Sequence, residues 1–168
     1  MLEFRMAEEA DINHILNIMH QAQEYLKEAG IDQWQNGYPN VETIKKDIEN
    51  EHGYVLSSAG KIAGTIAISF DGEKTYNNIY EGVWLTQDQY AVIHRLAVDG
   101  GLKGMGLASV MISETEKLCR RKAVSGIRVD THERNTSMQR LLKKNGFRYC
   151  GIIYLEDGSK RLAFEKIL

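Results

Sequence analysis

A glycine-rich turn between a short apolar strand and a helix constrains this chain more than any other feature. Residues 94–109 read HRLAVDGGLKGMGLAS, and the residues after them carry apolar side chains at helical spacing. A turn that opens directly into a helix leaves backbone N–H groups without carbonyl partners at the positive end of the helix dipole. Gly104 and Gly106 allow a ligand to approach these groups closely, and Lys103 adds a positive charge. The turn therefore predicts a site for a phosphate group.

Apolar periodicity predicts how the rest of the chain is organised. We expect strands at 2–6, 54–58, 61–70, 79–85, 90–98, 126–131, 147–155 and 161–167, and helices at 8–29, 41–48, 105–122 and 135–144. Tight turns at Ala59-Gly60 and Asp157-Gly158 predict two hairpins, and a later crossover helix predicts a parallel connection. This pattern is typical of one α/β domain over residues 1–168, with a mixed, largely antiparallel central sheet flanked by about four helices.

Composition and charge exclude several classes of protein. The formal net charge of -2 gives no general attraction to nucleic acid or to an anionic membrane. No stretch contains the ~20 apolar residues of a membrane-spanning helix, and residues 1–9 lack the basic start and apolar run of a secretion signal. Cys119 and Cys150 have no metal-ligand spacing, so we expect both to be reduced packing residues of a cytoplasmic protein.

Two familiar phosphate-binding loops do not fit this turn. A nucleoside-triphosphate loop requires G-x-x-x-x-G-K-[ST], and the sequence contains no such string. A dinucleotide-binding loop requires G-x-G-x-x-G after the first strand. Here Ser109 stands where that pattern needs its third glycine, and the turn lies late in the chain.

A third type of loop fits better. Strand 93–98, turn 101–108 and the later residues Asn135, Met138 and Gly146-Phe147 resemble the GNAT superfamily of N-acetyltransferases. The order of predicted elements also resembles that family over essentially the whole chain. The resemblance implies the acyl-CoA N-acyltransferase fold and acetyl-CoA as the cofactor. It assigns cofactor binding to Leu96, Ala97, Val98, Lys103, Gly104, Met105, Gly106, Leu107, Ala108, Asn135, Met138 and Lys144.

Two positions depart from the family's pattern. Gly101 stands where the family has arginine or glutamine, although backbone amides can still hold phosphates without that side chain. Leu142 stands where many members have a tyrosine that protonates the leaving thiolate. Tyr149 and Tyr154, on a late strand, are candidate replacements for this acid.

Transfer of an acetyl group from a thioester to an amine requires a stabilised oxyanion and a deprotonated amine. By its place in the family pattern, Leu96 would direct its backbone N–H toward the thioester oxygen. His94, whose reference pKa of ~6.5 suits proton transfer, and Glu81, acting through a water, are the candidate bases. His94 is equally explained as a hydrogen-bonded strand histidine. Asp130 and His132, at the end of the next strand, are further candidates.

Trp34 and Tyr38 are the candidate substrate-binding residues. They lie in the loop between the first two predicted helices, which in the resembled family borders the acceptor. Two aromatic rings near Asp32 could hold a cationic amine. Trp34 could instead close the core beneath the loop.

The resemblance implies an N-acetyltransferase that moves an acetyl group from acetyl-CoA to a primary amine of a small molecule or protein, by direct attack in a ternary complex. The alternative is a catalytically inactive coenzyme A-binding sensor or regulatory module, which the residues at positions 101 and 142 slightly favour. A charged transfer RNA is disfavoured as a partner because the chain has no basic run. We expect no metal, because acetyl transfer needs none, and exposed sheet edges favour a homodimer.

Overall fold

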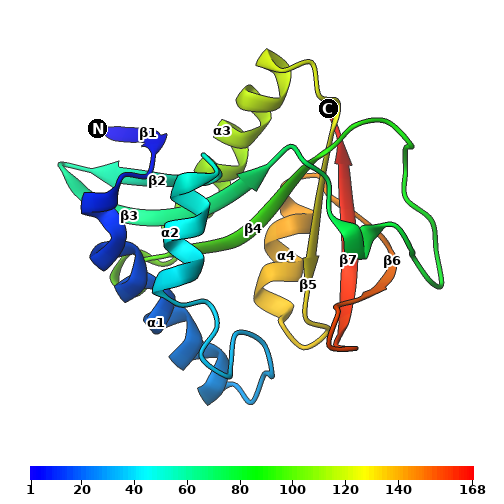
Figure 1. The fold of residues 1–168 in the computed structure, drawn as a ribbon, viewed down its shortest axis with the longest axis horizontal. Helices are drawn as coiled ribbons and strands as arrows, with labels where there is room; N and C mark the ends of the chain where they lie inside the picture. Colours follow the sequence, from blue (N-terminus) through cyan, green and yellow to red (C-terminus); the bar gives the residue numbers. More distant parts are fainter. The chain divides into compact units, whose positions relative to one another are not determined.

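Seven β-strands and four α-helices make up the computed structural model, which describes residues 1–168 and whose elements are labelled in Figure 1. The strands hydrogen-bond in the order β1-β2-β3-β4-β5-β7-β6. Their bounds are β1 Leu2–Met6, β2 Gly53–Ser58, β3 Lys61–Ser69, β4 Ala91–Val98, β5 Gly126–Thr131, β6 Arg148–Tyr154 and β7 Lys160–Ile167. The helices are α1 Ile12–Glu28, α2 Val41–Glu49, α3 Leu107–Arg121 and α4 Thr136–Lys144.

The strand directions confirm the predicted mixed, largely antiparallel sheet. The pairs β1–β2, β2–β3, β5–β7 and β6–β7 are antiparallel, whereas β4–β5 is parallel. The parallel pair is the one whose strands are connected through a helix, α3, as such pairs require. The predicted α/β class is therefore confirmed.

The chain divides into two structural units. The first unit comprises residues 1–68 and 94–114, and the second comprises residues 69–93 and 115–168. β4 begins in the second unit and ends in the first, whereas α3 begins in the first and ends in the second. Each unit has its own buried core and carries its own part of the predicted site.

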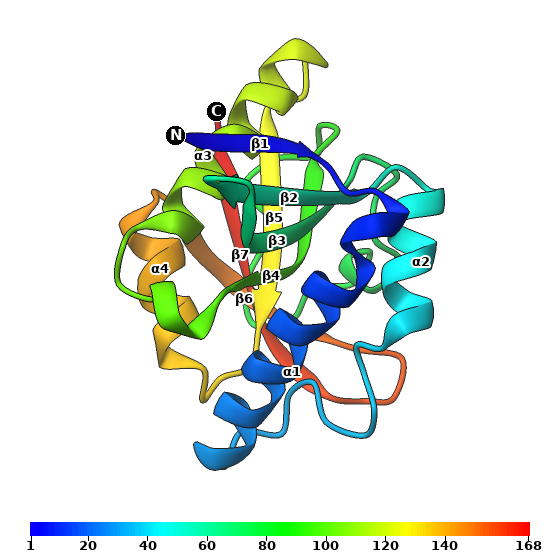
Figure 2. The same ribbon diagram turned by 90° about the vertical axis from the view of Figure 1, so that its left-hand side faces the viewer.

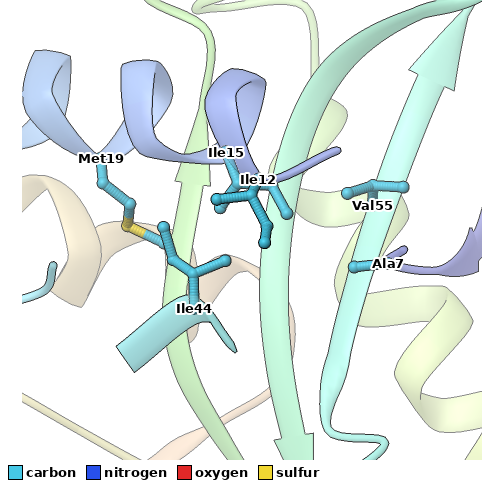
Figure 3. Close-up of a cluster of buried hydrophobic side chains, with 6 residues drawn as sticks. All are labelled: Ala7, Ile12, Ile15, Met19, Ile44 and Val55. Carbon is cyan, nitrogen blue, oxygen red and sulfur yellow. The ribbon is translucent and has the colours of Figure 1, made fainter. Parts of the chain in front are cut away.

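In the first unit, α1 and α2 lie side by side (Figure 1 and Figure 2). Ile12, Ile15 and Met19 recur at helical spacing on α1 and pack with Ile44 of α2 and Val55 of β2 (Figure 3). All five side chains are buried. Full burial of an aliphatic side chain of this size contributes about 1.5–3 kcal/mol, so this cluster holds both helices on the strands.

The start of α3 covers the opposite face of these strands. A Cβ on Gly64 of β3 would lie 2.6 Å from Cε of Met111, so the glycine allows α3 to approach closely. Val55, which faces α1 and α2, pairs with Thr65, the residue that follows Gly64. Because successive side chains of a strand point to opposite faces, α3 packs on the face away from α1 and α2.

The predicted start of a helix agrees with the structure where the sequence contains a local capping residue. Asn40 precedes α2, and its Oδ1 accepts a hydrogen bond from the N–H of Thr43 at 3.1 Å. The first predicted helix starts late because residues 9–11 form a separate 3-10 turn. The third begins at Leu107, not at 105, because Gly106 has φ +77, which an α-helix does not accommodate.

In the second unit, the predicted strand at 79–85 is wrong. Its only strand-like pairing is an isolated bridge between Tyr80 and β6. A Cβ on Gly82 would lie 1.8 Å from the carbonyl oxygen of Cys150, so the segment presses its backbone onto β6. Glu81 has φ +55, which interrupts an extended conformation.

Cys119 and Cys150 are free and buried, in agreement with their prediction as packing residues. Burial raises the pKa of each thiol to about 11, so both are neutral near pH 7. None of the helices has both the length and the apolar character that crossing a lipid bilayer requires.

Candidate cofactor and catalytic site

The segment that links β4 to the glycine-rich turn has a partner for each of its backbone N–H groups. In chain order, residues 99–102 donate to the carbonyl oxygen of Ala63, to Oε1 of Gln21, to Oδ1 of Asp99 and to the carbonyl oxygen of Asp99. The four donor–acceptor distances lie between 2.6 and 2.9 Å. This segment is therefore fixed in place.

The turn that follows has the opposite property. The N–H groups of residues 103–108 donate to no acceptor in the protein, and the first bond of α3 runs from Val110 N–H to the carbonyl of Gly106. Gly104 and Gly106 have φ values of +82 and +77, and a Cβ on either would meet nothing within 4 Å. Unpaired donors at a helix N-terminus, beside glycines with open space around them, fit a phosphate group.

Lys103 carries the formal charge of this turn. Its side chain is exposed, and its Nζ lies 4.0 Å from the centroid of the Tyr25 ring on α1. An ammonium over an exposed aromatic ring gains about 0.5–1 kcal/mol. The charge is therefore held on the α1 side of the turn.

The strand residues predicted to contact the cofactor, Leu96, Ala97 and Val98, form the last part of β4. Leu96 and Ala97 are buried, and Val98 is half-buried. Arg95, just before them, has φ +51, which is uncommon for any residue but glycine and breaks the regular strand there. The backbone is thus irregular directly beside the predicted oxyanion donor, Leu96.

The Arg95 side chain connects three elements of the first unit. Its Nε donates to Oδ2 of Asp47 on α2 at 3.0 Å, its Nη2 donates to Oδ1 of the same carboxylate, and its Nη1 donates to the Tyr38 hydroxyl at 2.8 Å. Sequence reasoning missed this cluster. The signal was present, because Arg95 is a charged residue inside an apolar strand pattern.

The two predicted acceptor-side aromatics differ in their surroundings. Trp34 is half-buried and packs against the core cluster of α1 and α2, which supports its structural interpretation. Tyr38 is 43% exposed while its hydroxyl is held by Arg95. Gln23 of α1 also donates to the carbonyl of Pro39 at 2.9 Å, so the loop is anchored at both residues.

His94 is half-buried on β4. Burial lowers the pKa of His94 to about 4, with smaller contributions from the nearby Arg95 and His52. The imidazole is therefore neutral at pH 7. A neutral imidazole can accept a proton, although with this pKa it is a weak base.

The other predicted catalytic residues, Glu81 and Tyr149, lie in the second unit. Glu81 is exposed on the irregular segment 79–90. Tyr149 of β6 is 48% exposed, and its ring contacts Phe164 edge-on with centroids 5.8 Å apart. Tyr154 is 45% exposed and contacts Tyr80 in the same manner.

The second predicted cofactor motif forms the start of α4. Asn135 is the N-cap, with its Oδ1 accepting from the N–H of Met138 at 3.2 Å. Met138 is half-buried, and Lys144 is exposed at the other end of the helix. Leu142, at the position of the family's tyrosine, is completely buried and offers no polar group.

A half-buried acidic cluster at the end of β5 gives the candidate Asp130 a defined partner. The Tyr76 hydroxyl donates to Oδ2 of Asp130 at 2.7 Å. Burial raises the pKa of Asp130, and burial together with the Asp130 charge raises the pKa of Glu73. His132 instead accepts a hydrogen bond at Nδ1 from the N–H of Arg134, within its own turn. No group of three or more His, Cys, Asp or Glu side chains is arranged to hold a metal ion.

Comparison with known proteins identifies the family. The family model of the acetyltransferase (GNAT) family matches residues 17–147, well over half of the chain. The chain belongs to the GNAT family of acetyltransferases. No curated protein is significantly similar to it.

Solved structures agree with this assignment. A GNAT acetyltransferase from Streptococcus agalactiae 2603 shares 35% identity with a TM-score of 0.90, over 99% of this chain and 95% of that chain. A GNAT acetyltransferase from Listeria monocytogenes 4b F2365 shares 26% identity with a TM-score of 0.76, over 99% and 95%. The PaiA N-acetyltransferase of Thermoplasma acidophilum, in complex with coenzyme A, shares the fold at 15% identity and a TM-score of 0.76, over 100% and 99%. The GNAT fold predicted from the sequence is confirmed.

Proposed function

We propose that this GNAT protein is an acetyl-CoA-dependent N-acetyltransferase whose 103–108 turn binds the pyrophosphate of coenzyme A. The observation that carries the proposal is the run of backbone N–H groups without acceptors, beside two glycines that face open space. Family membership supports acetyl-CoA as the acetyl source, and coenzyme A is the ligand of the PaiA enzyme with the same fold.

The turn would hold the pyrophosphate mainly through its backbone. Hydrogen bonds to a charged acceptor are roughly twice as strong as those between neutral groups, so several amides together outweigh the single charge of Lys103. Asn135, Met138 and Lys144 are assigned to the same cofactor through the family resemblance. Bound acetyl-CoA supplies an acetyl group already activated as a thioester.

The backbone N–H of Leu96 is the proposed donor to the oxyanion. One such donor contributes about 10²–10³ to the rate in enzymes that transfer acyl groups. His94 and Glu81 are the two proposed bases that take the proton from the acceptor amine. Tyr149 is the proposed donor to the leaving thiolate, and its exposed position is compatible with that task.

The proposed acceptor is a primary amine of a small molecule or of a protein. Tyr38 is the stronger of the two predicted acceptor contacts, because its ring is exposed while its hydroxyl is held in place. An aromatic face of this kind attracts an ammonium group. Trp34 would act indirectly, by supporting the loop that carries Tyr38.

A second candidate function is a coenzyme A-binding sensor without catalysis. Leu142 favours it, because the completely buried leucine leaves no proton donor at the position where the family has a tyrosine. A thiolate with a pKa near ~8.5 can nevertheless leave without a donor near neutral pH. The first candidate is therefore preferred.

Two measurements on the purified protein test the proposal. Acetyl-CoA should raise Tm progressively with concentration, because a ligand bound only by the folded state stabilises it, whereas NAD and ATP should have much smaller effects. Release of free thiol from acetyl-CoA in the presence of a panel of amines then separates the enzyme from the sensor. A Tm that acetyl-CoA leaves unchanged and NAD raises would contradict the cofactor assignment.

A further inference from the structure

Two residues of α1 contact the glycine-rich turn and the segment that leads into it. Oε1 of Gln21 accepts a hydrogen bond from the N–H of Gly100 at 2.6 Å. The Tyr25 ring lies 4.0 Å below Nζ of Lys103. Residues four apart lie on the same face of a helix, so one face of α1 meets the chain at both positions.

Four hydrogen bonds hold the N–H groups of residues 99–102, and the one to Gln21 differs from the other three in its origin. Two of those come from Asp99 itself, and one comes from the backbone of β3 at Ala63. Gln21 is thus the only side chain from outside the segment that fixes it. A Cβ on Gly100 would lie 3.0 Å from Oε1 of Gln21, so the glycine and the glutamine fit each other closely.

The turn itself has little internal support. None of the N–H groups of residues 103–108 is hydrogen-bonded within the protein, so their positions depend on the elements before and after them. α3 fixes the later end. At the earlier end, the fixed points are residues 99–102 and the Lys103 side chain, and α1 contacts both.

We propose that Gln21 and Tyr25 are positioning residues for the cofactor turn. Gln21 fixes the main chain at Gly100, and Tyr25 holds the Lys103 ammonium, so the free amides are in place before the ligand arrives. A site that is already ordered loses less conformational entropy on binding, and its affinity is higher for that reason. This inference rests on the proposed function, because it takes coenzyme A as the ligand of the turn.

Three variants test the role of Gln21. Gln21→Met keeps the length of the side chain and removes the acceptor, whereas Gln21→Glu keeps an oxygen acceptor. Asn13→Met places a methionine at an exposed position of the same helix and serves as the control. Amide exchange of Gly100, measured by NMR on the ligand-free protein, reports the anchor directly. Calorimetry with coenzyme A reports its effect on binding.

Gln21→Met should speed exchange of the Gly100 amide and raise the Kd for coenzyme A about fivefold, the equivalent of one neutral hydrogen bond of ~1 kcal/mol. Tm should change little, since the bond is exposed. Gln21→Glu should restore slow exchange, and Asn13→Met should match the wild type. Unchanged exchange and Kd in Gln21→Met would overturn the proposal. If the wild type binds no coenzyme A, the proposed function fails, while Gly100 exchange still decides whether Gln21 fixes the turn.

The role of Tyr25 is tested through the ring alone. Tyr25→Leu should raise the Kd for coenzyme A about two- to fivefold, the value of an exposed cation–π contact, and Tyr25→Phe should restore the wild-type Kd. If Tyr25→Phe weakens binding as much as Tyr25→Leu, the hydroxyl and not the ring is responsible, and this part of the proposal is overturned.

Discussion

Segment 79–90 of the second unit and turn 103–108 of the first unit both interrupt regular structure, but only segment 79–90 is anchored by hydrogen bonds to residues far away in the sequence. In the first segment, Leu85 N–H donates to Oε1 of Glu165 at 2.7 Å, and Trp84 Nε1–H donates to a backbone carbonyl at 2.9 Å. In the turn, no N–H has a partner. Irregular backbone that is hydrogen-bonded to neighbouring strands is part of the scaffold, whereas a run of N–H groups without acceptors at a helix N-terminus is available to a ligand.

Arg128 of β5 is the main anchor of segment 79–90. Its guanidinium contacts the rings of both Trp84 and Tyr90, with Cζ 4.1 and 3.9 Å from the ring centroids. Its Nη2 donates to the carbonyl of Thr86 at 2.7 Å, and its Nε donates to Oε2 of Glu165 at 3.1 Å. One side chain thus holds the segment through charge, hydrogen bonding and aromatic packing.

The largest expected effect comes from removing this anchor of segment 79–90. Arg128→Met should lower the free energy of unfolding by about 3–5 kcal/mol, because it leaves the completely buried Glu165 carboxylate without its cation. Lys160→Met removes an exposed ion pair with Glu133 and should leave stability nearly unchanged. Urea unfolding of the two variants gives the comparison. A similar, small decrease in the free energy of unfolding of both variants would mean that segment 79–90 does not depend on Arg128.

The second effect comes from blocking the unpaired turn. Gly106→Asp places a carboxylate where phosphate oxygens would approach, so the Kd for coenzyme A should rise about a hundredfold or more, equivalent to ~2.7 kcal/mol. Gly158→Asp is the matched control. Its φ of +85 and open surroundings resemble those of Gly106, so the backbone strain is shared, but it lies in the β6–β7 turn. Equal binding by the two variants in calorimetry would contradict the role of the turn.

His94 sharpens the comparison, because it is a half-buried titratable group whose pKa is strongly lowered by burial. Its pKa is about 4 in the folded protein and ~6.5 in the unfolded chain, so the unfolded state binds more protons between these values. Stability should therefore fall as pH drops from about 6.5 to about 4. His94→Gln should remove on the order of 2 kcal/mol of this fall. Urea unfolding at pH 7 and pH 4.5 measures this fall in the free energy of unfolding. An equal fall in the wild type and in His94→Gln would show that His94 is not responsible.

The smallest effect concerns the one formal charge of the turn. Lys103→Ala should raise the Kd for coenzyme A only about two- to fivefold, because an exposed lysine is a single screened charge beside several backbone donors. Raising the salt concentration should reduce the difference in Kd between Lys103→Ala and the wild type. If Lys103→Ala lost more affinity for coenzyme A than Gly106→Asp, the charge of the lysine and not the backbone would hold the ligand.

Features that depend on neighbours in sequence could be predicted without the structure. Asn40 capped α2, and the Ala59-Gly60 turn joined β2 to β3, because both signals act within a few residues. The strand predicted at 79–85 failed for the converse reason. Its residues favour a strand locally, but its partners, Arg128 and Glu165, lie far along the chain.

The same distinction holds within the candidate site. The turn glycines and Lys103 were read from one short stretch of sequence. The contact of Gln21 with Gly100 and that of Arg95 with Asp47 and Tyr38 join positions widely separated in sequence. Local patterns can mark Arg95 as unusual, but they do not identify the partners of Arg95 or of Gln21. The low pKa of His94 likewise follows from burial, which no local pattern reports.

An NMR titration of the ¹⁵N-labelled protein with coenzyme A tests the central claim most directly. If the unpaired amides hold the pyrophosphate, the backbone signals of residues 103–108 should shift strongly and saturably, because each N–H gains a charged acceptor. The amide of Leu85 in segment 79–90, which is already hydrogen-bonded to Glu165, should shift much less. Saturable binding that leaves the signals of residues 103–108 in place would contradict the account.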